Sequence, residues 1–233
     1  MPREVIDSRR IVQEHAAYCK LLAECSAIVR RLDVNRDLPD CAFIEDTAVV
    51  LDEVAILCSM GAASRRAEPQ GIETVLGEYR EVVRIDPPAK LEGGDVLKVG
   101  DKLLVGQSGR TSGAGIAALA AFVRRYGYLV TAVPVRGALH LKTACTALPD
   151  GRLLMNPAWI DAAALGEYEL VRIPEEEPWS ANVALVGTTV LMNAAYVQSA
   201  ELVRSLGFIV RTTDLSEFAK AEGGVTCLSL LIA

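Results

Sequence analysis

A short pattern occurs four times along this chain of 233 residues: an apolar run, a tight turn and a second apolar run. The turns carry Asp-Glu, Gly-Asp, Asp-Gly or Gly-Thr, which is typical of β-hairpins. The four copies are Ala48–Cys58, Asp95–Val105, Thr143–Met155 and Val183–Met192. Repetition with a period of about 45 residues indicates an array of equivalent structural units rather than one continuous sheet.

Each hairpin is followed by a segment with helical periodicity and then by one more apolar run. Two of these segments begin with a serine that could cap a helix. The predicted helices are Ser64–Arg80, Ser112–Tyr126, Ala158–Leu165 and Tyr196–Leu206, and the strands expected after them are Glu81–Ile85, Tyr128–Val135, Tyr168–Ile173 and Phe208–Thr212. The repeating unit is therefore a hairpin, a helix, a strand and a loop.

The two ends of the chain supply parts of a fifth unit. Ile6–Ser26 is predicted to be an amphipathic helix and Ile28–Leu32 a strand, while Val225–Ile232 is expected to be the first strand of a hairpin. The partner of that strand, expected just before the first helix, is missing. Repeated units around an axis close into a ring that hides strand edges. We therefore predict one domain over residues 1–233, an α/β propeller with fivefold pseudosymmetry that lacks its first N-terminal strand.

Composition narrows the class of protein. Hydrophobic residues make up 51% of the chain, which excludes disorder, and the formal net charge of -6 argues against a nucleic-acid-binding surface. The apolar runs are too short to cross a bilayer, and the N-terminus has no apolar signal core. We expect a cytoplasmic protein that binds neither nucleic acid nor membrane. Six cysteines without a CxxC pair, together with two histidines, argue against a disulfide scaffold and a zinc site.

The loops before the hairpins hold equivalent places in the units, so we expect them to converge at one mouth of the ring. They carry His140 and Cys227 together with several carboxylates. A cysteine and a histidine on facing loops can act as nucleophile and general acid/base. The surrounding acids favour a cationic substrate, because a carboxylate pairs bidentately with a guanidinium. Arg65 and Arg110, which follow the first two hairpins, could hold a carboxylate.

Each of these residues also has a structural interpretation. Asp40 and Asp95 could be turn residues, His140 a hydrogen-bonded structural histidine, and Cys227 a core residue of a strand. The two arginines could be surface residues at helix starts. The common position of the polar residues in the repeat favours the catalytic interpretation.

Five phrases of the sequence, FIEDTAVV, LEGGDVL, SGRT, ALHLKTACTALPDG and AEGGVTCLSL, resemble in this order the guanidine-modifying, or pentein, superfamily. The resemblance is closest to the dimethylarginine dimethylaminohydrolases and extends from about Ile6 to Leu231. It implies a fivefold pseudosymmetric α/β propeller, which the repeat predicts independently. It also implies hydrolysis of asymmetric dimethylarginine or monomethylarginine to citrulline and a methylamine, with no metal or organic cofactor.

The resemblance assigns roles to the polar loop residues. Cys227 would attack the guanidinium carbon and form a covalent thiouronium intermediate, while His140 would protonate the departing amine and then activate water. Glu92 would lie near His140 and the guanidinium, and Asp46 would bind the guanidinium nitrogens. The remaining positions that match the family are Asp40 and Glu45 as substrate contacts, Phe43 as a packing residue, and Arg65 and Arg110 as holders of the amino-acid end.

The acids around Cys227 should raise the pKa of its thiol, and a cationic substrate would offset them. We therefore predict that thiolate formation is coupled to substrate binding.

Two features of the sequence distinguish hydrolysis of methylated arginine from hydrolysis of arginine. Arginine deiminases carry a carboxylate two residues after the histidine, where this chain has Lys142, and a helical insertion that this chain lacks. Both differences favour methylated arginine over arginine. The alternatives are an arginine deiminase, an amidinotransferase acting on another guanidino compound, or a weakly active or non-catalytic protein of the same fold. The resemblance also suggests a homodimer.

Overall fold

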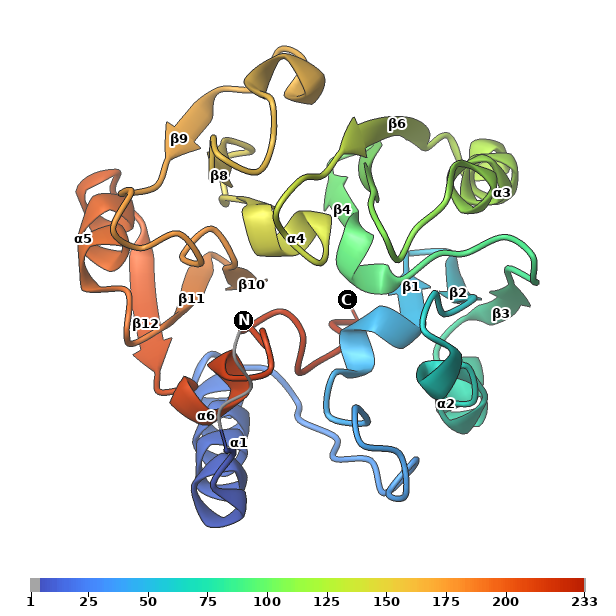
Figure 1. The fold of residues 1–233 in the computed structure, drawn as a ribbon, viewed down its shortest axis with the longest axis horizontal. Helices are drawn as coiled ribbons and strands as arrows, with labels where there is room; N and C mark the ends of the chain where they lie inside the picture. The colour runs from blue at the N-terminus through green and yellow to red at the C-terminus, as the bar shows by residue number, and fades with distance from the viewer. Residues whose placement is uncertain (1–4, 233) are drawn as a thin grey trace.

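The computed structural model describes residues 5–232, in which four three-stranded sheets stand around a central axis (Figure 1). In every sheet the first two strands form an antiparallel hairpin, and the third strand pairs in parallel with the second. The strands are β1 Ala48–Val50, β2 Val54–Leu57, β3 Glu81–Arg84, β4 Val96–Val99, β5 Lys102–Gln107, β6 Leu129–Pro134, β7 Cys145–Ala147, β8 Leu153–Met155, β9 Leu170–Arg172, β10 Ala184–Val186, β11 Thr189–Asn193 and β12 Ile209–Thr213. The predicted pseudosymmetric α/β propeller is confirmed.

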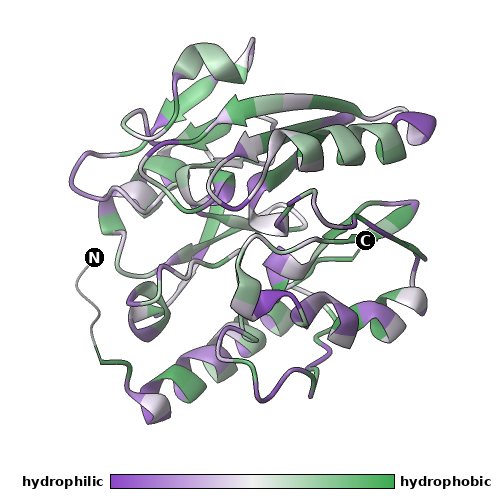
Figure 2. Cartoon of the chain, turned by 45° about the vertical axis from the view of Figure 1, so that its right-hand side comes forward, coloured by the Kyte–Doolittle hydropathy of each residue, from purple (hydrophilic) through white to green (hydrophobic). Residues whose placement is uncertain are grey.

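The longer helices lie on the outside of the ring, and the first strands of the hairpins lie near its axis (Figure 1). The helices are α1 Ser8–Glu24, α2 Glu68–Gly77, α3 Gly113–Val123, α4 Leu141–Ala144, α5 Val197–Ser205 and α6 Ser216–Ala219. Apolar side chains of the sheets and of the inner helix faces form the core between these layers. The strands are coloured mostly green in Figure 2 because their residues are hydrophobic. Burial of this apolar surface is the main stabilising contribution.

Of the two serines predicted to cap helices, one does so and the other does not. The Ser112 hydroxyl accepts the N–H of Gly115 at 3.1 Å and caps α3 as predicted. Ser64 caps nothing, because it lies in a separate 3-10 turn, Ala63–Arg65, and α2 begins only at Glu68. Pro69 in the first turn explains this start, since proline has no N–H and is preset for that position.

The fifth unit departs from the prediction. Within residues 5–232, neither Ile28–Leu32 nor Val225–Ile232 belongs to a strand. In the other four units the second strand stands between the first and third and pairs with both. No described segment fills that place here, so the two flanking segments have no ladder partner. Their side chains Leu32, Leu230 and Ile232 instead pack against the core around β1, β2 and α2.

The loops that precede the hairpins do converge. The 3-10 turn Ile44–Thr47 contacts the 3-10 turn Gly93–Asp95, and the latter contacts α4. Three different units thereby bring their polar residues to one place.

Candidate active site

A buried cluster of two carboxylates and one imidazole forms where these loops meet. The Nε2 atom of His140 lies 2.7 Å from Glu92 Oε2, and its Nδ1 lies 3.7 Å from Asp46 Oδ1. All three residues are buried, and their ligand atoms lie within 4.8 Å of one another. Burial opposes protonation of the ring, but Asp46 and Glu92 outweigh it and raise the pKa of His140 to about 9. At neutral pH the imidazole therefore holds a proton that it can give to a leaving group.

The backbone around Glu92 fits this cluster closely. Glu92 Oε1 accepts the N–H of Gly61 at 2.8 Å and lies 3.5 Å from Arg110 Nη1. A Cβ on Gly94 would stand 2.5 Å from Asp46 Oδ1 and 2.8 Å from His140 Nδ1. The second glycine of LEGGD is thus required because the two loops approach each other too closely for a side chain.

Asp46 is fixed by an arginine from the next element. Arg65 Nη1 lies 2.6 Å from Asp46 Oδ2, while Nη2 donates to Glu68 Oε2 at 2.7 Å and to the carbonyl of Phe43 at 2.9 Å. Burial opposes ionisation of Asp46, but His140 and Arg65 outweigh it and lower the pKa of the carboxyl. Arg65, expected to hold the amino-acid end of a substrate, is therefore buried and engaged with two acids of its own chain.

Cys227 is half-buried at the start of the C-terminal segment. Its Sγ accepts the N–H of Gly224 at 3.4 Å, and its carbonyl accepts the N–H of Glu45 at 3.2 Å. Burial, Glu45 and Asp46 together raise the pKa of the thiol to about 12. Glu45 and Asp46 are neighbours in the chain, so one short turn contacts both the cysteine and the histidine cluster.

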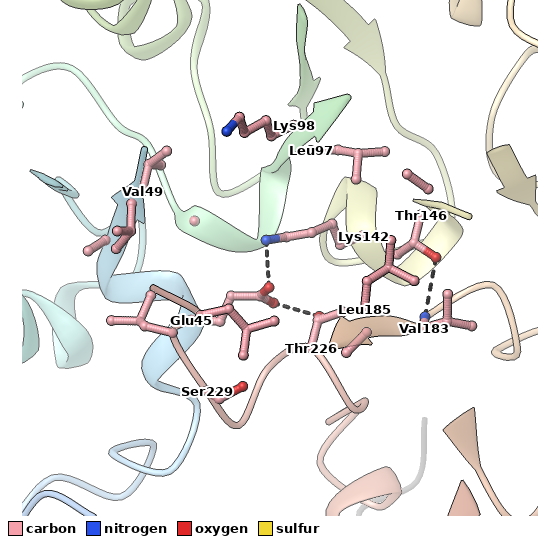
Figure 3. A pocket seen from close by; sticks show the side chains of 17 residues that line it. Glu45, Val49, Leu97, Lys98, Lys142, Thr146, Val183, Leu185, Thr226 and Ser229 are labelled. Carbon is pink, nitrogen blue, oxygen red and sulfur yellow. Dashed lines mark hydrogen bonds and ion pairs between the residues drawn. The ribbon is translucent and has the colours of Figure 1, made fainter. Parts of the chain in front are cut away.

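Glu45 also lines a central cavity of about 240 Å³, together with the first strands of the hairpins (Figure 3). Lys142 Nζ lies 2.5 Å from Glu45 Oε1, and the hydroxyl of Thr226 donates to Glu45 Oε2 at 2.6 Å (Figure 3). Burial raises the pKa of Glu45 despite the opposing effect of Lys142. Glu45, expected to contact substrate, thus has both oxygens engaged within the protein.

The other predicted binding residues lie at the edges of the cluster. Asp40 is half-buried, and its carboxylate has no hydrogen-bond partner among residues 5–232. Phe43 packs edge-on against Phe218, with the ring centroids 6.2 Å apart. The Arg110 side chain is 28% exposed, so part of its guanidinium remains available to a ligand.

Two positioning residues were missed by sequence reasoning. Asp95 is fully buried and accepts the N–H of Leu141 at 2.8 Å, which fixes the start of α4 directly after His140. Its place in LEGGD beside Glu92 was the available signal. The hydroxyl of Tyr18 in α1 donates to the carbonyl of Val225 at 2.9 Å and lies 2.8 Å from Ser229 Oγ. It holds the chain on both sides of Cys227, and no sequence signal links residues so far apart.

Asp46, Glu92 and His140 could also hold a metal ion by the spacing of their donor atoms. His140 lies between the two carboxylates, and Arg65 and the protonated imidazole supply the positive charge that faces them. No helix in the described part of the chain is long and apolar enough to cross a membrane.

The chain is similar in sequence to proteins of one known family. Residues 29–177 match the family model described as arginine deiminase. The chain is 40% identical over 230 residues to an N(G),N(G)-dimethylarginine dimethylaminohydrolase of Streptomyces coelicolor, covering 98% of this chain and 88% of that protein. It is 33% identical to the protein of the same name from Pseudomonas aeruginosa, covering 96% and 89%.

A solved structure of the Pseudomonas aeruginosa enzyme, a Cys-to-Ser variant complexed with citrulline, superposes with a TM-score of 0.94 at 31% identity over 99% of this chain and 91% of that chain. Sequence and fold therefore agree, and the chain belongs to the dimethylarginine dimethylaminohydrolase family of the pentein superfamily.

Proposed function

We propose that the protein hydrolyses asymmetric dimethylarginine and monomethylarginine to citrulline and a methylamine. The observation that carries the proposal is that one short turn contacts both Cys227 and His140: the N–H of Glu45 donates to the carbonyl of Cys227, and Asp46 Oδ1 lies 3.7 Å from Nδ1 of the buried His140. Relatives with the dimethylaminohydrolase name support the substrate class.

Charge complementarity supports a guanidinium ligand. Asp46 and Glu92 carry negative charge in a buried site, where a cation with several N–H donors can bind both. Asp40 and Arg110 have free capacity for the amino and carboxylate groups of the substrate. The role of Arg65 is revised to positioning Asp46, because its guanidinium already binds two acids.

The reaction has two halves. The cationic substrate offsets Glu45 and Asp46, the half-buried Cys227 thiol gives its proton to solvent, and the thiolate sulfur forms a bond to the guanidinium carbon. The bond from that carbon to the methylated nitrogen breaks as His140 gives this nitrogen a proton. The neutral imidazole then takes a proton from water, the hydroxide adds to the thiouronium carbon, and the C–S bond breaks to give citrulline and the free cysteine.

The alternative is hydrolysis of arginine itself, which the description of the matching family model favours. Lys142 argues against it, since it neutralises Glu45 at a position where arginine deiminases carry a carboxylate.

Product analysis tests the proposal. The purified chain should release citrulline and dimethylamine from asymmetric dimethylarginine, release citrulline far more slowly from arginine, and lose both activities in Cys227→Ser. The buried Cys145→Ser variant serves as a matched control for replacement of a thiol. Comparable turnover of arginine would assign the deiminase activity instead, and an active Cys227→Ser variant would refute the nucleophile.

A further inference from the structure

A second cavity, of about 160 Å³, adjoins the nucleophile. Its lining includes Gly223 and Gly224, and the N–H of Gly224 donates to Cys227 Sγ. Its lining also includes Thr143, whose N–H donates to the carbonyl of His140 at 3.2 Å. The cavity therefore touches both the loop of the nucleophile and the short helix that begins at the general acid.

Two aromatic residues and one acidic residue, Trp179, Tyr196 and Glu222, are among those that line this cavity. The Trp179 ring is held by the ring of Trp159, with centroids 4.8 Å apart at 66°. The Glu222 carboxylate has no hydrogen bond or ion pair with any residue of the described range 5–232. Its backbone has φ 61°, a conformation that residues other than glycine rarely adopt.

The cavity also offers unused polar atoms. Thr143 is 7% exposed and Asn193 is 4% exposed. The hydroxyl of Thr143 and the side-chain nitrogen of Asn193 have no hydrogen-bond partner within residues 5–232. Neither atom is fully enclosed by protein, so both remain accessible. A buried residue with an accessible, unpaired polar atom presents that atom to a cavity, so a polar ligand can bind there.

We propose that this cavity receives the methylated amine released in the first half-reaction, as dimethylammonium or methylammonium. The inference rests on the proposed function. Methylated ammonium ions bind over the faces of Trp and Tyr beside a carboxylate. The N–H groups of the ion can donate to Glu222 and to the Thr143 hydroxyl.

Chemistry and size agree with this occupant. The electron pair of the broken C–N bond stays on nitrogen, which takes its proton from His140. The released amine is a stronger base than imidazole and takes a second proton from solvent, so it becomes a cation beside Glu222. One water molecule occupies about 30 Å³ in the liquid, so the cavity has room for an ion of three heavy atoms. Hydrolysis of arginine would release ammonia, which gains little from aromatic walls.

Tryptophan fluorescence tests the inference independently of turnover. The chain has 2 tryptophans, so Trp159→Phe leaves Trp179 as the only reporter and keeps an aromatic ring against it. Dimethylammonium chloride, titrated at ionic strength held constant with sodium chloride, should change the emission saturably. Glu222→Gln in this background should weaken binding at least about fivefold, and ammonium should bind weaker than dimethylammonium by a similar factor. The exposed Glu201→Gln should leave binding unchanged.

Calorimetry of dimethylammonium binding to the unmodified chain repeats the test without the tryptophan replacement. No saturable binding by either method, or equal affinity in the Glu222→Gln variant, would overturn the inference. Citrulline formation by the same preparation separates the two claims. If the protein forms citrulline but does not bind dimethylammonium, only the proposed amine site is refuted. If it forms no citrulline from any methylarginine, the proposed function is refuted, and with it the role of the cavity in receiving the leaving group.

Discussion

Replacing Glu92 by glutamine should lower the pKa of His140 from about 9 to between about 7 and 8. The present value lies above the ordinary 6.5, a net stabilisation of the imidazolium of about 3 kcal/mol after the opposing effect of burial. The 2.7 Å contact with Glu92 is a hydrogen bond between charged groups. Such a bond is worth about 1.5–3 kcal/mol, or about one to two pKa units. Asp46 remains and prevents a full return to 6.5.

Nitrogen-15 histidine NMR measures this shift directly, because the chain has only His15 and His140 and a His15→Gln variant assigns them. Glutamine keeps the size of Glu92 and an acceptor oxygen, so a change in pKa reports charge rather than a cavity. The exposed Glu201→Gln should leave the titration of His140 unchanged. An unaltered pKa in Glu92→Gln would refute the assignment of Glu92 as one of the two acids that keep His140 protonated.

The same pKa has a consequence for stability. The folded-state pKa of His140 is raised above the unfolded value, so its contribution is fully present below pH 6.5 and is lost as the pH rises through about 9. The free energy of unfolding, measured by urea denaturation across this range, should fall less in His140→Gln than in the wild type. The thiol of Cys227 has a pKa near 12 in the free protein, so its rate of reaction with iodoacetamide should rise about tenfold for each unit of pH. A non-reactive guanidinium ligand should increase this rate, because it favours the thiolate. A thiolate that titrates below neutral pH without ligand would contradict the coupling of thiolate formation to substrate binding. Tyr18→Phe should lower the unfolding free energy by about 1–2 kcal/mol, whereas the exposed Tyr79→Phe should not. Gly94→Ala should reduce turnover at least about tenfold by placing a methyl group inside the histidine cluster, while Gly109→Ala, which meets open space, should be silent.

The repeating part of the fold could be predicted because its signals are local. Turn dipeptides between apolar runs define each hairpin, and all four hairpins and the strands after them appear in the structure. A helix follows three of the hairpins, whereas the predicted helix Ala158–Leu165 is wrong, because that segment holds only a 3-10 turn, Ala162–Leu165. The fifth unit could not be predicted, because Val225–Ile232 has the composition of a strand but no described neighbour with which to pair. A strand forms only when a neighbouring segment hydrogen-bonds with it, and the composition of one segment does not show whether that neighbour is present.

The site divides in the same way. The convergence of His140, Glu92 and Asp46 follows from their equivalent places in the repeat. The partners of Arg65 could not be predicted in this way, because an arginine near a helix start binds whichever acids the fold brings to it. Here those acids are Asp46 and Glu68. Tyr18 acts across 207 residues of sequence, a distance at which no pattern predicts contact.

The central claim is that Cys227 forms a covalent bond to the guanidinium carbon of a methylated arginine. Mixing the protein with asymmetric dimethylarginine, quenching with acid during turnover and mapping the peptides by mass spectrometry tests it most directly. The account predicts a thiouronium adduct confined to the peptide that carries Cys227, absent with the Cys227→Ser variant and much reduced in His140→Gln, which cannot protonate the departing amine. Release of citrulline with no adduct on that peptide, or an adduct on another cysteine, would contradict it.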